Sequence, residues 1–345
     1  MENSTLLITQ EEIQSVLDSP SVLNIVERTY RSHGEGKVVL PPKLTLDLGE
    51  GASWPPYQGF MNAMPAYLGD VDVAGIKWVG GFKGNLAKGL PYITGMILLI
   101  NPQNGMFIAV LEGAYITALR TGAASAVFAK YLARKDSTVL TIIGAGMQGR
   151  MHLRALSQVF NLTEIRVADI DEARMQEYCR SMAAEIRVNI RPTRSLEEAV
   201  RGADIVCTLT AASEPLVRKE WLKRGALVIG GGSYQELGAD VILKADKIVI
   251  DNWAQASHRG ALAGLVGAGK LSQENVYANI FEIVTGRKAG RETDDEDIVA
   301  VPVGLGSLDI ACAYEAYQRA VKQGAGTRFA FLNLGSTGTV SEATG

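Results

Sequence analysis

The chain has 345 residues, of which 47% are hydrophobic and 21% are charged, and its formal net charge is −3 at pH 7. This is ordinary globular composition in a chain long enough for two domains. Without a basic excess there is no electrostatic footprint for a nucleic acid, so we expect no such partner. The first residues lack the basic start of a signal peptide, and no apolar run reaches the roughly 18 residues that span a bilayer. We therefore expect a cytoplasmic protein without membrane contact.

Cysteine and histidine usage argues against a disulfide framework and against a bound metal. Cys179, Cys207 and Cys312 are odd in number and widely spaced, which favours buried thiols in a reducing compartment. The three histidines show no metal-ligand spacing. The acidic run at 292–297 is interpreted as a solvated loop.

The first third of the chain predicts two helices followed by a run of strands. Thr9 and Glu12 form a capping box that opens a short helix, and a second helix is predicted from Ser19 to Gly34. Between residues 38 and 112 the segments VVLPPKLTLDL, GFMNAMPAYL, VAGIKWVGGF, YITGMILLI and MFIAVLE predict strands, with a hairpin loop at 101–105. Strands in succession predict an antiparallel sheet. An alanine-rich helix is predicted over 114–134.

After residue 136 short apolar strands alternate with helices. The predicted strands lie at 137–144, 164–169, 187–190, 203–210, 225–231 and 247–251, and a last helix begins near 310. This alternation predicts a doubly wound parallel sheet. The predicted fold class is α/β: a Rossmann domain at 126–309 beside an α+β substrate-binding and dimerisation domain. The second domain, with a largely antiparallel sheet, would comprise 1–125 and 310–345.

A glycine motif at 144–149 predicts a dinucleotide site. Gly144, Gly146 and Gly149 close an apolar strand and open a helix, and Asp169 ends the next strand. The three glycines allow the tight turn, close approach of a pyrophosphate, and close helix–strand packing. Asp169 can accept hydrogen bonds from ribose hydroxyls and would repel a 2′-phosphate, and Ile170–Asp171 supplies no arginine, so NAD(H) is favoured over NADP(H). The alternative is a glycine turn without a cofactor.

With these motifs in place, the chain resembles the ornithine cyclodeaminase/mu-crystallin family, especially its archaeal-type alanine dehydrogenases. The resemblance runs from about residue 7 to 330. Its blocks are Pro41–Lys43, Ala63–Pro65, Ala74–Val79, Ala118–Ala123, the glycine motif and Thr285–Arg287. In that family the first domain forms a dimer and supplies substrate groups. The resemblance thus implies a small amino, imino or oxo acid substrate and a homodimer.

Four residues matched to the family are the candidate catalytic groups: Lys77, Arg120, Lys43 and Asp309. From sequence alone Lys77 could point to solvent, Arg120 could lie on a helix surface, and Asp309 could cap the following helix. The resemblance implies that Lys77 faces the substrate and can exchange a proton, while Arg120 and Lys43 bind the substrate carboxylate. It also places the aspartate near the nicotinamide.

The remaining candidates divide between cofactor and substrate. The resemblance implies that Thr121 reaches a cofactor phosphate. Thr208 and Thr210 end a predicted strand, where they either contact the cofactor ribose or are ordinary polar residues at a strand end. The cofactor set is Gly144, Gly146, Met147, Gln148, Gly149, Asp169, Ile170, Thr121, Thr208, Thr210 and Gly230. The substrate set is Asn62, Met64, Lys43, Lys77, Arg120 and Ser233.

Two departures from the family narrow the chemistry. Cyclodeaminases carry an aspartate where this chain has Gly232–Ser233, and a glutamate where it has Asn62. A distal substrate ammonium would then lack an anion to hold it. The sequence favours an NAD(H)-dependent amino-acid dehydrogenase or ketimine reductase. A cyclodeaminating lyase with recycled NAD and a non-catalytic NAD(P)H-binding protein remain alternatives, and the substrate stays open.

Overall fold

The computed structural model describes residues 4–49, 57–232 and 234–331. The chain forms two compact units, which are described separately: unit one holds residues 1–18, 38–117 and 309–345, and unit two holds 19–37 and 118–308. These limits differ from the domain limits predicted from the sequence mainly at helix α2 (Ser19–Gly34), which groups with unit two. Its buried Tyr30 packs edge-on against Phe128 of α3 (Ala114–Leu132), a contact that sequence periodicity does not reveal.

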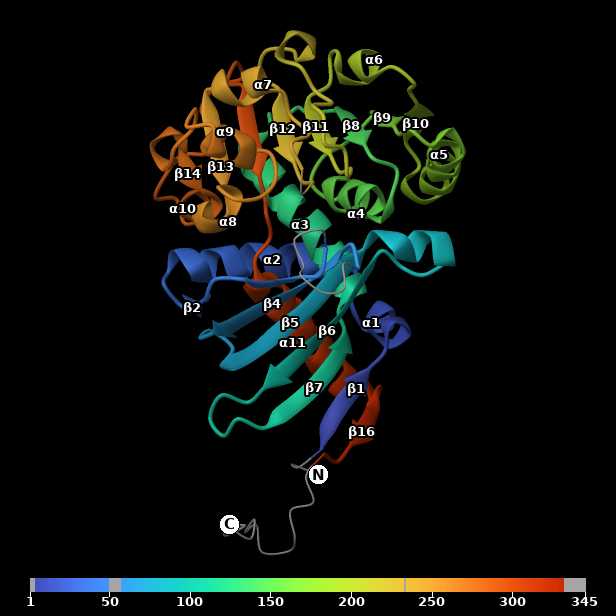
Figure 1. Ribbon diagram of the computed structural model, residues 1–345, viewed down its shortest axis with the longest axis vertical. Coiled ribbons are helices and arrows are strands. Elements are labelled where there is room, and N and C mark those ends of the chain that lie inside the picture. The colour runs from blue at the N-terminus through green and yellow to red at the C-terminus, as the bar shows by residue number, and fades with distance from the viewer. Residues whose placement is uncertain (1–3, 50–56, 233, 332–345) are drawn as a thin grey trace, which may run out of the picture. The chain divides into compact units, whose positions relative to one another are not determined.

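Unit one is built on an eight-stranded sheet, sheet A, visible in the lower part of Figure 1. Its strands are β1 (Thr5–Ile8), β2 (Val38–Val39), β3 (Leu44–Asp47), β4 (Gly59–Leu68), β5 (Val73–Phe82), β6 (Ile93–Ile100), β7 (Phe107–Glu112) and β16 (Thr327–Phe329). The order is β16-β1-β7-β6-β5-β4-β2, with β3 also on β4. Every pairing is antiparallel except that of β1 with β7, so the largely antiparallel sheet is confirmed.

The first predicted strand, at 38–48, is wrong as a single element. It is divided into β2 and β3 by Pro41 and Pro42, because proline has no N–H to donate to a ladder. Two further strands, β1 and β16, were not predicted. They are short, and they pair with each other across almost the whole chain.

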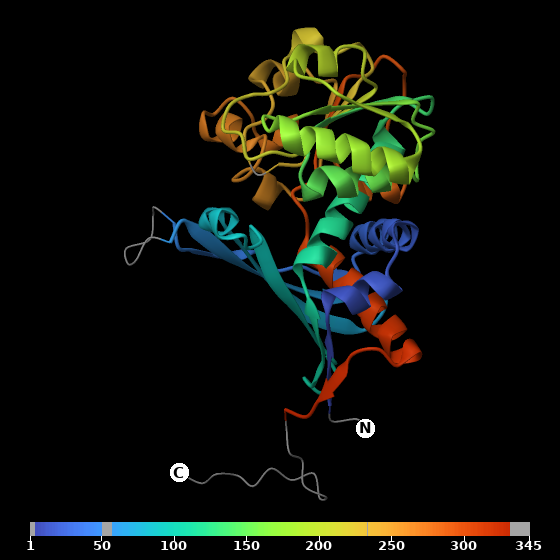
Figure 2. The ribbon, with the colours of Figure 1, turned by 90° about the vertical axis from the view of Figure 1, so that its right-hand side faces the viewer.

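One face of sheet A is covered by a helix and the other is not. Helix α11 (Gly306–Gln323) lies along one face, and Figure 2 shows no described element over the opposite face. Helix α1 (Gln10–Val16), which opens with the predicted Thr9–Glu12 capping box, and the short helix η1 (Lys83–Lys88) complete the unit. Alternate side chains along β4, β5 and β6 are buried beneath α11, as the period of a strand requires.

Unit two is a doubly wound domain around sheet B, an eight-stranded sheet in which all neighbours are parallel. Its strands are β8 (Val139–Ile143), β9 (Glu164–Ala168), β10 (Asn189–Pro192), β11 (Ile205–Thr208), β12 (Leu227–Gly230), β13 (Lys247–Ile250), β14 (Ala278–Asn279) and β15 (Ile298–Val301). The strands are ordered β10-β9-β8-β11-β12-β15-β13-β14. From β8 the chain first adds β9 and β10 on one side and then returns to add β11 on the other, so the switch point lies between β8 and β11. This confirms the predicted α/β class with a Rossmann sheet.

Helices flank sheet B in Figure 1. Besides α2 and α3 they are α4 (Met147–Leu156), α5 (Glu172–Ile186), α6 (Leu196–Val200), α7 (Ala239–Leu243), α8 (Trp253–Ala256), α9 (Ala263–Gly267) and α10 (Ile280–Val284), with short turns η2 (Lys219–Trp221) and η3 (Gln273–Asn275). The central strands are buried along their whole length, which is why their sequences are continuous apolar runs.

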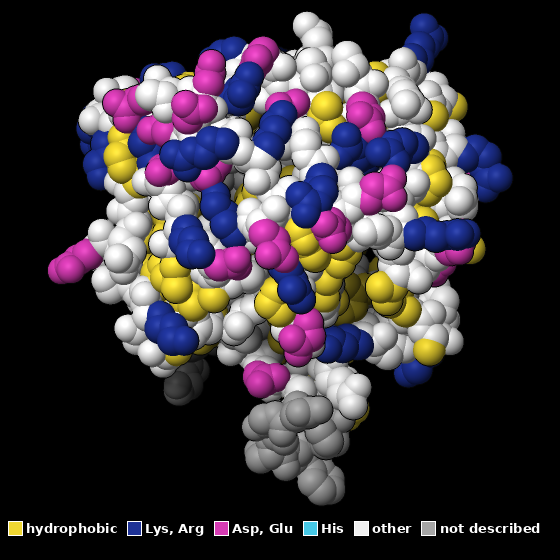
Figure 3. Space-filling view, turned by 90° about the horizontal axis from the view of Figure 1, so that it is seen from above, with side chains coloured by type: hydrophobic (Ala, Val, Ile, Leu, Met, Phe, Trp, Pro, Cys, Tyr) yellow, Lys and Arg dark blue, Asp and Glu magenta, His cyan; other side chains and the backbone are white. Residues whose placement is uncertain are grey.

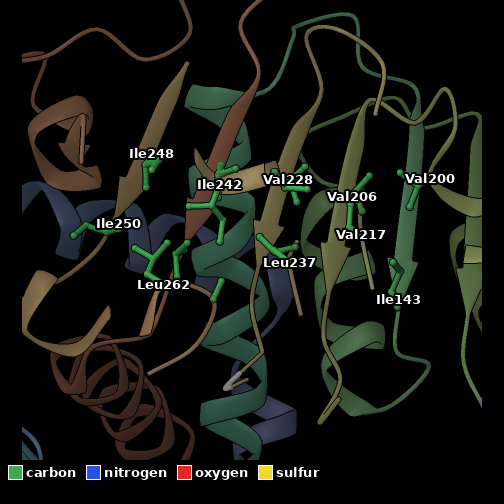
Figure 4. Close-up of a cluster of buried hydrophobic side chains, with 14 of the residues drawn as sticks. Ile143, Val200, Val206, Val217, Val228, Leu237, Ile242, Ile248, Ile250 and Leu262 are labelled. Atoms are coloured by element: carbon green, nitrogen blue, oxygen red, sulfur yellow. The ribbon is translucent and has the colours of Figure 1, made fainter. Parts of the chain in front are cut away.

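The core of unit two is a cluster of aliphatic side chains from strands and helices together. Figure 4 shows Val206 and Val228 on neighbouring strands, with Ile242 and Leu262 from outside the sheet packed in the same cluster. Each such side chain contributes about 1.5–3 kcal/mol when removed from water. This burial fixes the strand ends on which the polar groups described below are mounted.

The surface carries charges of both signs. On the face shown in Figure 3, Lys and Arg side chains are interspersed with Asp and Glu. Among the described residues no helix is long and apolar enough to cross a membrane. The same part of the chain contains no cluster of His, Cys, Asp and Glu able to hold a metal ion. Cys179, Cys207 and Cys312 are buried.

Candidate active site

The glycine turn of unit two leads directly from β8 into α4. Gly144 has φ +114°, and a Cβ there would lie 2.6 Å from the Leu209 carbonyl oxygen, so this position requires glycine. A Cβ on Gly149 would overlap the Gly144 carbonyl oxygen. Two of the three motif glycines are therefore required by the fold itself, because backbone passes against backbone at both.

The third glycine and the helix start leave room for an anion. Gly146 is the N-cap of α4 and supplies no side-chain hydrogen bond to the first N–H groups of the helix. A Cβ placed on Gly146 would meet no heavy atom within 4 Å, so the turn is open on this side. Uncapped N–H groups and the positive end of the helix dipole suit a pyrophosphate. The buried Gln148 Oε1 also has no hydrogen-bond partner among the described residues, while Met147 beside it is exposed.

Asp169 follows β9 and is tied to the glycine turn. Its Oδ2 accepts a hydrogen bond from the Ala145 N–H at 2.7 Å, and its Oδ1 accepts from the Asp171 N–H at 2.9 Å and from Arg174 at 2.7 Å. Burial would raise the pKa of Asp169, but these hydrogen bonds outweigh it and hold the pKa below its usual value. The lowered pKa favours the ionised carboxylate, and Ile170 is exposed next to it.

Arg174 is a residue that the sequence interpretation missed. It stands in the first turn of α5, and its guanidinium pairs with Asp169. The two residues directly after Asp169, Ile170 and Asp171, supply no arginine. An arginine one helical turn further on reaches the same carboxylate.

The carboxyl ends of β8, β11 and β12 meet at the switch point of sheet B, where ligands bind in this kind of fold. Thr208 and Gly230 are opposite one another at the ends of β11 and β12 and are both buried. Thr210 follows on the loop, where its N–H and its hydroxyl both donate to Glu236 Oε1 at 2.6 Å. Apart from Thr121 on α3, the predicted cofactor residues of unit two therefore lie at the carboxyl ends of its parallel strands.

Glu236 was not predicted either. Its side chain is buried within the loop after β12, and burial raises the pKa of its carboxyl above the usual value although the Thr210 hydrogen bonds lower it. A Cβ on Gly232 would overlap this carboxyl group. The loop that lacks the cyclodeaminase aspartate thus contains a carboxylate, but one directed at the β11 loop. A glutamate in a glycine-rich loop gives no sequence signal that its side chain is buried against another loop.

In unit one, Lys77 and Asp309 form a buried ion pair. Lys77 Nζ lies 2.7 Å from Asp309 Oδ2, and the two side chains are 1% and 0% exposed. The solvent alternative for Lys77 is excluded. The N-cap alternative for Asp309 is also excluded, because Asp309 lies inside the first turn of α11, which begins at Gly306. The hydroxyl of Thr117 is 3.4 Å from the other Asp309 oxygen.

The substrate candidates of β4 share the face that carries Lys77. Met64 is directly opposite Lys77 in the sheet, and Asn62, two residues away on β4, points to the same side. Both are buried, and Asn62 Oδ1 accepts a hydrogen bond from the Thr45 hydroxyl at 2.7 Å. Lys43, just before β3, is half-buried. Ser233 lies outside the described residues.

In unit two, Arg120 and Thr121 lie on α3. Arg120 is buried, which excludes the surface alternative, and its guanidinium packs against the Cα of Gly304. Thr121 is half-buried. The structure therefore buries both predicted cations, Lys77 and Arg120.

A parallel sheet with an open glycine turn and an acidic residue at the next strand end defines a dinucleotide-binding domain. Comparison with known proteins agrees. Alanine dehydrogenase of Archaeoglobus fulgidus is 36% identical over 337 residues, covering 96% of this chain and 99% of the relative. The structure of Thermococcus litoralis Δ1-pyrroline-2-carboxylate reductase with NADH and L-proline has a TM-score of 0.89 at 32% identity, covering 94% and 99% of the chains.

An archaeal alanine dehydrogenase dimer with bound NAD gives a TM-score of 0.87 at 36% identity, covering 95% of this chain and 100% of the other. The sequence profile of the ornithine cyclodeaminase/mu-crystallin family matches residues 3–324. The chain belongs to that family. The likenesses confirm the expected enzyme class, an oxidoreductase, and NAD(H) as the cofactor.

Proposed function

We propose that the protein is an NAD(H)-dependent oxidoreductase that acts on the C–N bond of a small amino or imino acid, as an amino-acid dehydrogenase or a ketimine reductase. The observation that carries the proposal is the buried Lys77–Asp309 pair on the sheet face that also holds Asn62 and Met64. A polar pair is retained in such an apolar setting when it serves chemistry or specificity. Its similarity to alanine dehydrogenase and pyrroline-2-carboxylate reductase supports the reaction class.

In this proposal each charged residue has a separate role in binding or proton transfer. When bound, NAD(H) supplies or accepts the hydride at the α-carbon, and the open Gly146 turn with Asp169 holds its phosphates and adenosine ribose. Lys77 Nζ, held by Asp309, delivers or removes a proton at the substrate nitrogen. The guanidinium of Arg120 binds the substrate carboxylate through two parallel hydrogen bonds, a geometry that a planar fork provides, and Lys43 adds a second positive charge.

The test is a substrate panel of 2-oxo acids with ammonia or amines, cyclic imino acids and diamines. Absorbance of the reduced nicotinamide and ammonia release are followed together. We expect NADH consumption with an oxo acid plus an amine or with a cyclic imine, and loss of at least a hundredfold in kcat/KM for Lys77→Met, in line with removal of a general acid. Lys270→Met, at an exposed lysine, is the matched control.

Other outcomes would overturn the proposal. Ammonia release from ornithine without accumulation of NADH would indicate a cyclodeaminating lyase. Tight NADH binding with no turnover of any panel member, unchanged in Lys77→Met, would indicate a non-catalytic binder.

We also propose that the protein works as a homodimer through the uncovered face of sheet A. Antiparallel sheets usually present polar residues on a face that is open to water. Here several outward side chains are apolar and more than half exposed, Leu44 at 72% and Trp78 at 51% among them. The same set includes Val39, Leu46 and Met96. Proline, glycine and aliphatic residues also line a shallow cavity of about 400 Å³ on this face. The related archaeal alanine dehydrogenase is a dimer.

Substitution of Met96 by Glu tests the dimer. It places a charge in the centre of the outward face, opposite Trp78 in the register, and we expect a monomer by light scattering coupled to size exclusion. Glu177→Lys, on the exposed surface of α5, is the control. A wild-type monomer, or an unchanged dimer in Met96→Glu, contradicts the proposal. Three buried and widely spaced cysteines suit the reducing cytoplasm that we propose as its location.

A further inference from the structure

Asp251 is a fully buried carboxyl group at the end of β13 that the proposed chemistry leaves without a role. Its Oδ1 accepts a hydrogen bond from the Val303 N–H at 3.1 Å, and its Oδ2 accepts from the Gly304 N–H at 2.7 Å. Two consecutive amides of the connection between β15 and α11 are thus bound by one carboxylate. Two hydrogen bonds offset only part of the cost of burying a charge.

Arg120 approaches the same connection. Gly304 has φ +92°, and a Cβ at this position would overlap the Arg120 guanidinium. The carboxylate of Asp251 and the guanidinium of Arg120 therefore both lie against the backbone at Gly304. The positive charge of Arg120 favours the ionised form of Asp251. A third polar group, the phenol of Tyr30 from α2, is fully buried and interacts electrostatically with both.

We propose that Asp251 is the counter-charge of Arg120 in the substrate-free protein and takes up a proton from solvent when a substrate carboxylate binds Arg120. The inference rests on the proposed function, which assigns the carboxylate to Arg120. One guanidinium cannot compensate two buried carboxylates, since like charges in a site of low polarity disfavour each other. Protonation of Asp251 leaves one positive and one negative charge, and the neutral acid still accepts hydrogen bonds from the connection.

The electrostatics of the site support this direction. Burial raises the pKa of Asp251 to about 6, against the opposing effects of the Gly304 and Val303 amides and of Arg120. A second anion at Arg120 weakens that opposing effect and moves the pKa of Asp251 higher still. Arg120 from α3 and Tyr30 from α2 are charged or titratable groups that interact electrostatically with Asp251.

Linkage then fixes the pH dependence. Binding is favoured when Asp251 is protonated, so affinity for a carboxylate rises as pH falls from about 8 toward 6, by up to about tenfold per pH unit, and levels off below 6. The half-buried His33 and the buried His152 of unit two do not titrate in this window, because removal from water lowers the pKa of each to about 4.

The experiment measures propionate binding to the full-length enzyme–NAD⁺ complex by titration calorimetry across this pH range. Propionate has no group that titrates there. Runs in two buffers with different ionisation heats give the number of protons taken up. We expect up to one proton per propionate in the wild type, none in Asp251→Asn, and a pH-independent affinity in that variant. Tyr30→Phe removes the neighbouring hydroxyl and is expected to retain the wild-type slope.

Three results separate the possible failures. If Arg120→Met binds propionate as the wild type does, or if the wild type does not bind it, the carboxylate role of Arg120 in the proposed function is wrong and this inference falls with it. If Arg120 is needed but the wild type takes up no proton, the inference alone is wrong. A uniform loss of affinity in Asp251→Asn with the slope retained would assign Asp251 a merely structural role and would also overturn it.

Discussion

Replacement of Lys77 by methionine tests the buried ion pair directly. Two unit charges 2.7 Å apart attract by about 6 kcal/mol at an effective dielectric constant of about 20. Removing two ions from water costs several kcal/mol for each, so the intact pair is close to neutral for stability. The single variant is different, because Asp309 stays fully buried and loses its partner. We expect Lys77→Met to lower the free energy of unfolding by about 3–5 kcal/mol.

The double variant Lys77→Met/Asp309→Leu removes both charges. We expect it to be less destabilised than Lys77→Met alone, since no uncompensated charge remains. The assay is urea denaturation at pH 7 followed by circular dichroism. Glu177→Gln, which breaks the exposed pair of Glu177 with Arg180, is the control and should change stability by less than about 1 kcal/mol. The reasoning is refuted if Lys77→Met is as mild as this control, or if the double variant is the least stable of all.

Three further predictions concern unit two. Gly146→Ala is expected to keep the wild-type melting temperature but to weaken NADH binding, because its Cβ meets no protein atom and enters the proposed pyrophosphate position. Gly149→Ala is expected to lower the melting temperature, because its Cβ overlaps a backbone carbonyl. Equal melting temperatures of the two variants would contradict this. Asp169→Ala is expected to weaken NADH binding about tenfold and to improve NADPH binding. The variant removes the negative charge that repels a 2′-phosphate and releases Arg174 from its ion pair. Unchanged NADH affinity in fluorescence titrations would show that the ribose assignment is wrong. Burial raises the folded-state pKa of Glu236, so its contribution to stability is present below the unfolded pKa of about 4.5 and is lost as pH rises through the folded pKa. Glu236→Gln should therefore gain stability relative to the wild type on going from pH 4.5 to 7, and a constant difference in unfolding free energy would count against the buried acid.

Local patterns were sufficient for the elements that form one amphipathic or fully buried run. β4 and β5 begin and end where their alternating sequences do, and α1 begins at its capping box. The double proline at 41–42 should have divided the first predicted strand, since the missing N–H is visible in the sequence. β1 could not be found in this way: a threonine and three apolar residues become a strand only because β7 and β16 lie beside them.

The site shows the same division. The glycine turn and Asp169 were found from spacing, because the geometry of a dinucleotide turn is local. The residues around Lys77 in the sequence do not show whether its side chain faces water or a partner. The partner is Asp309, which folding brings to Lys77 from the far end of the chain. Glu236 and Asp251 gave no signal at all. Their importance comes from burial and from the N–H groups that they bind, which only the tertiary structure provides.

The central claim is that a hydride moves between C4 of NAD(H) and the α-carbon of an amino or imino acid. It is tested most directly with NADH carrying deuterium at C4, one stereoisomer at a time, and the panel member that is turned over. Mass spectrometry of the product should find one deuterium at the α-carbon with one of the two stereoisomers and one NADH consumed per product formed. Product without deuterium from either stereoisomer, or product formed without net NADH consumption, would contradict the account.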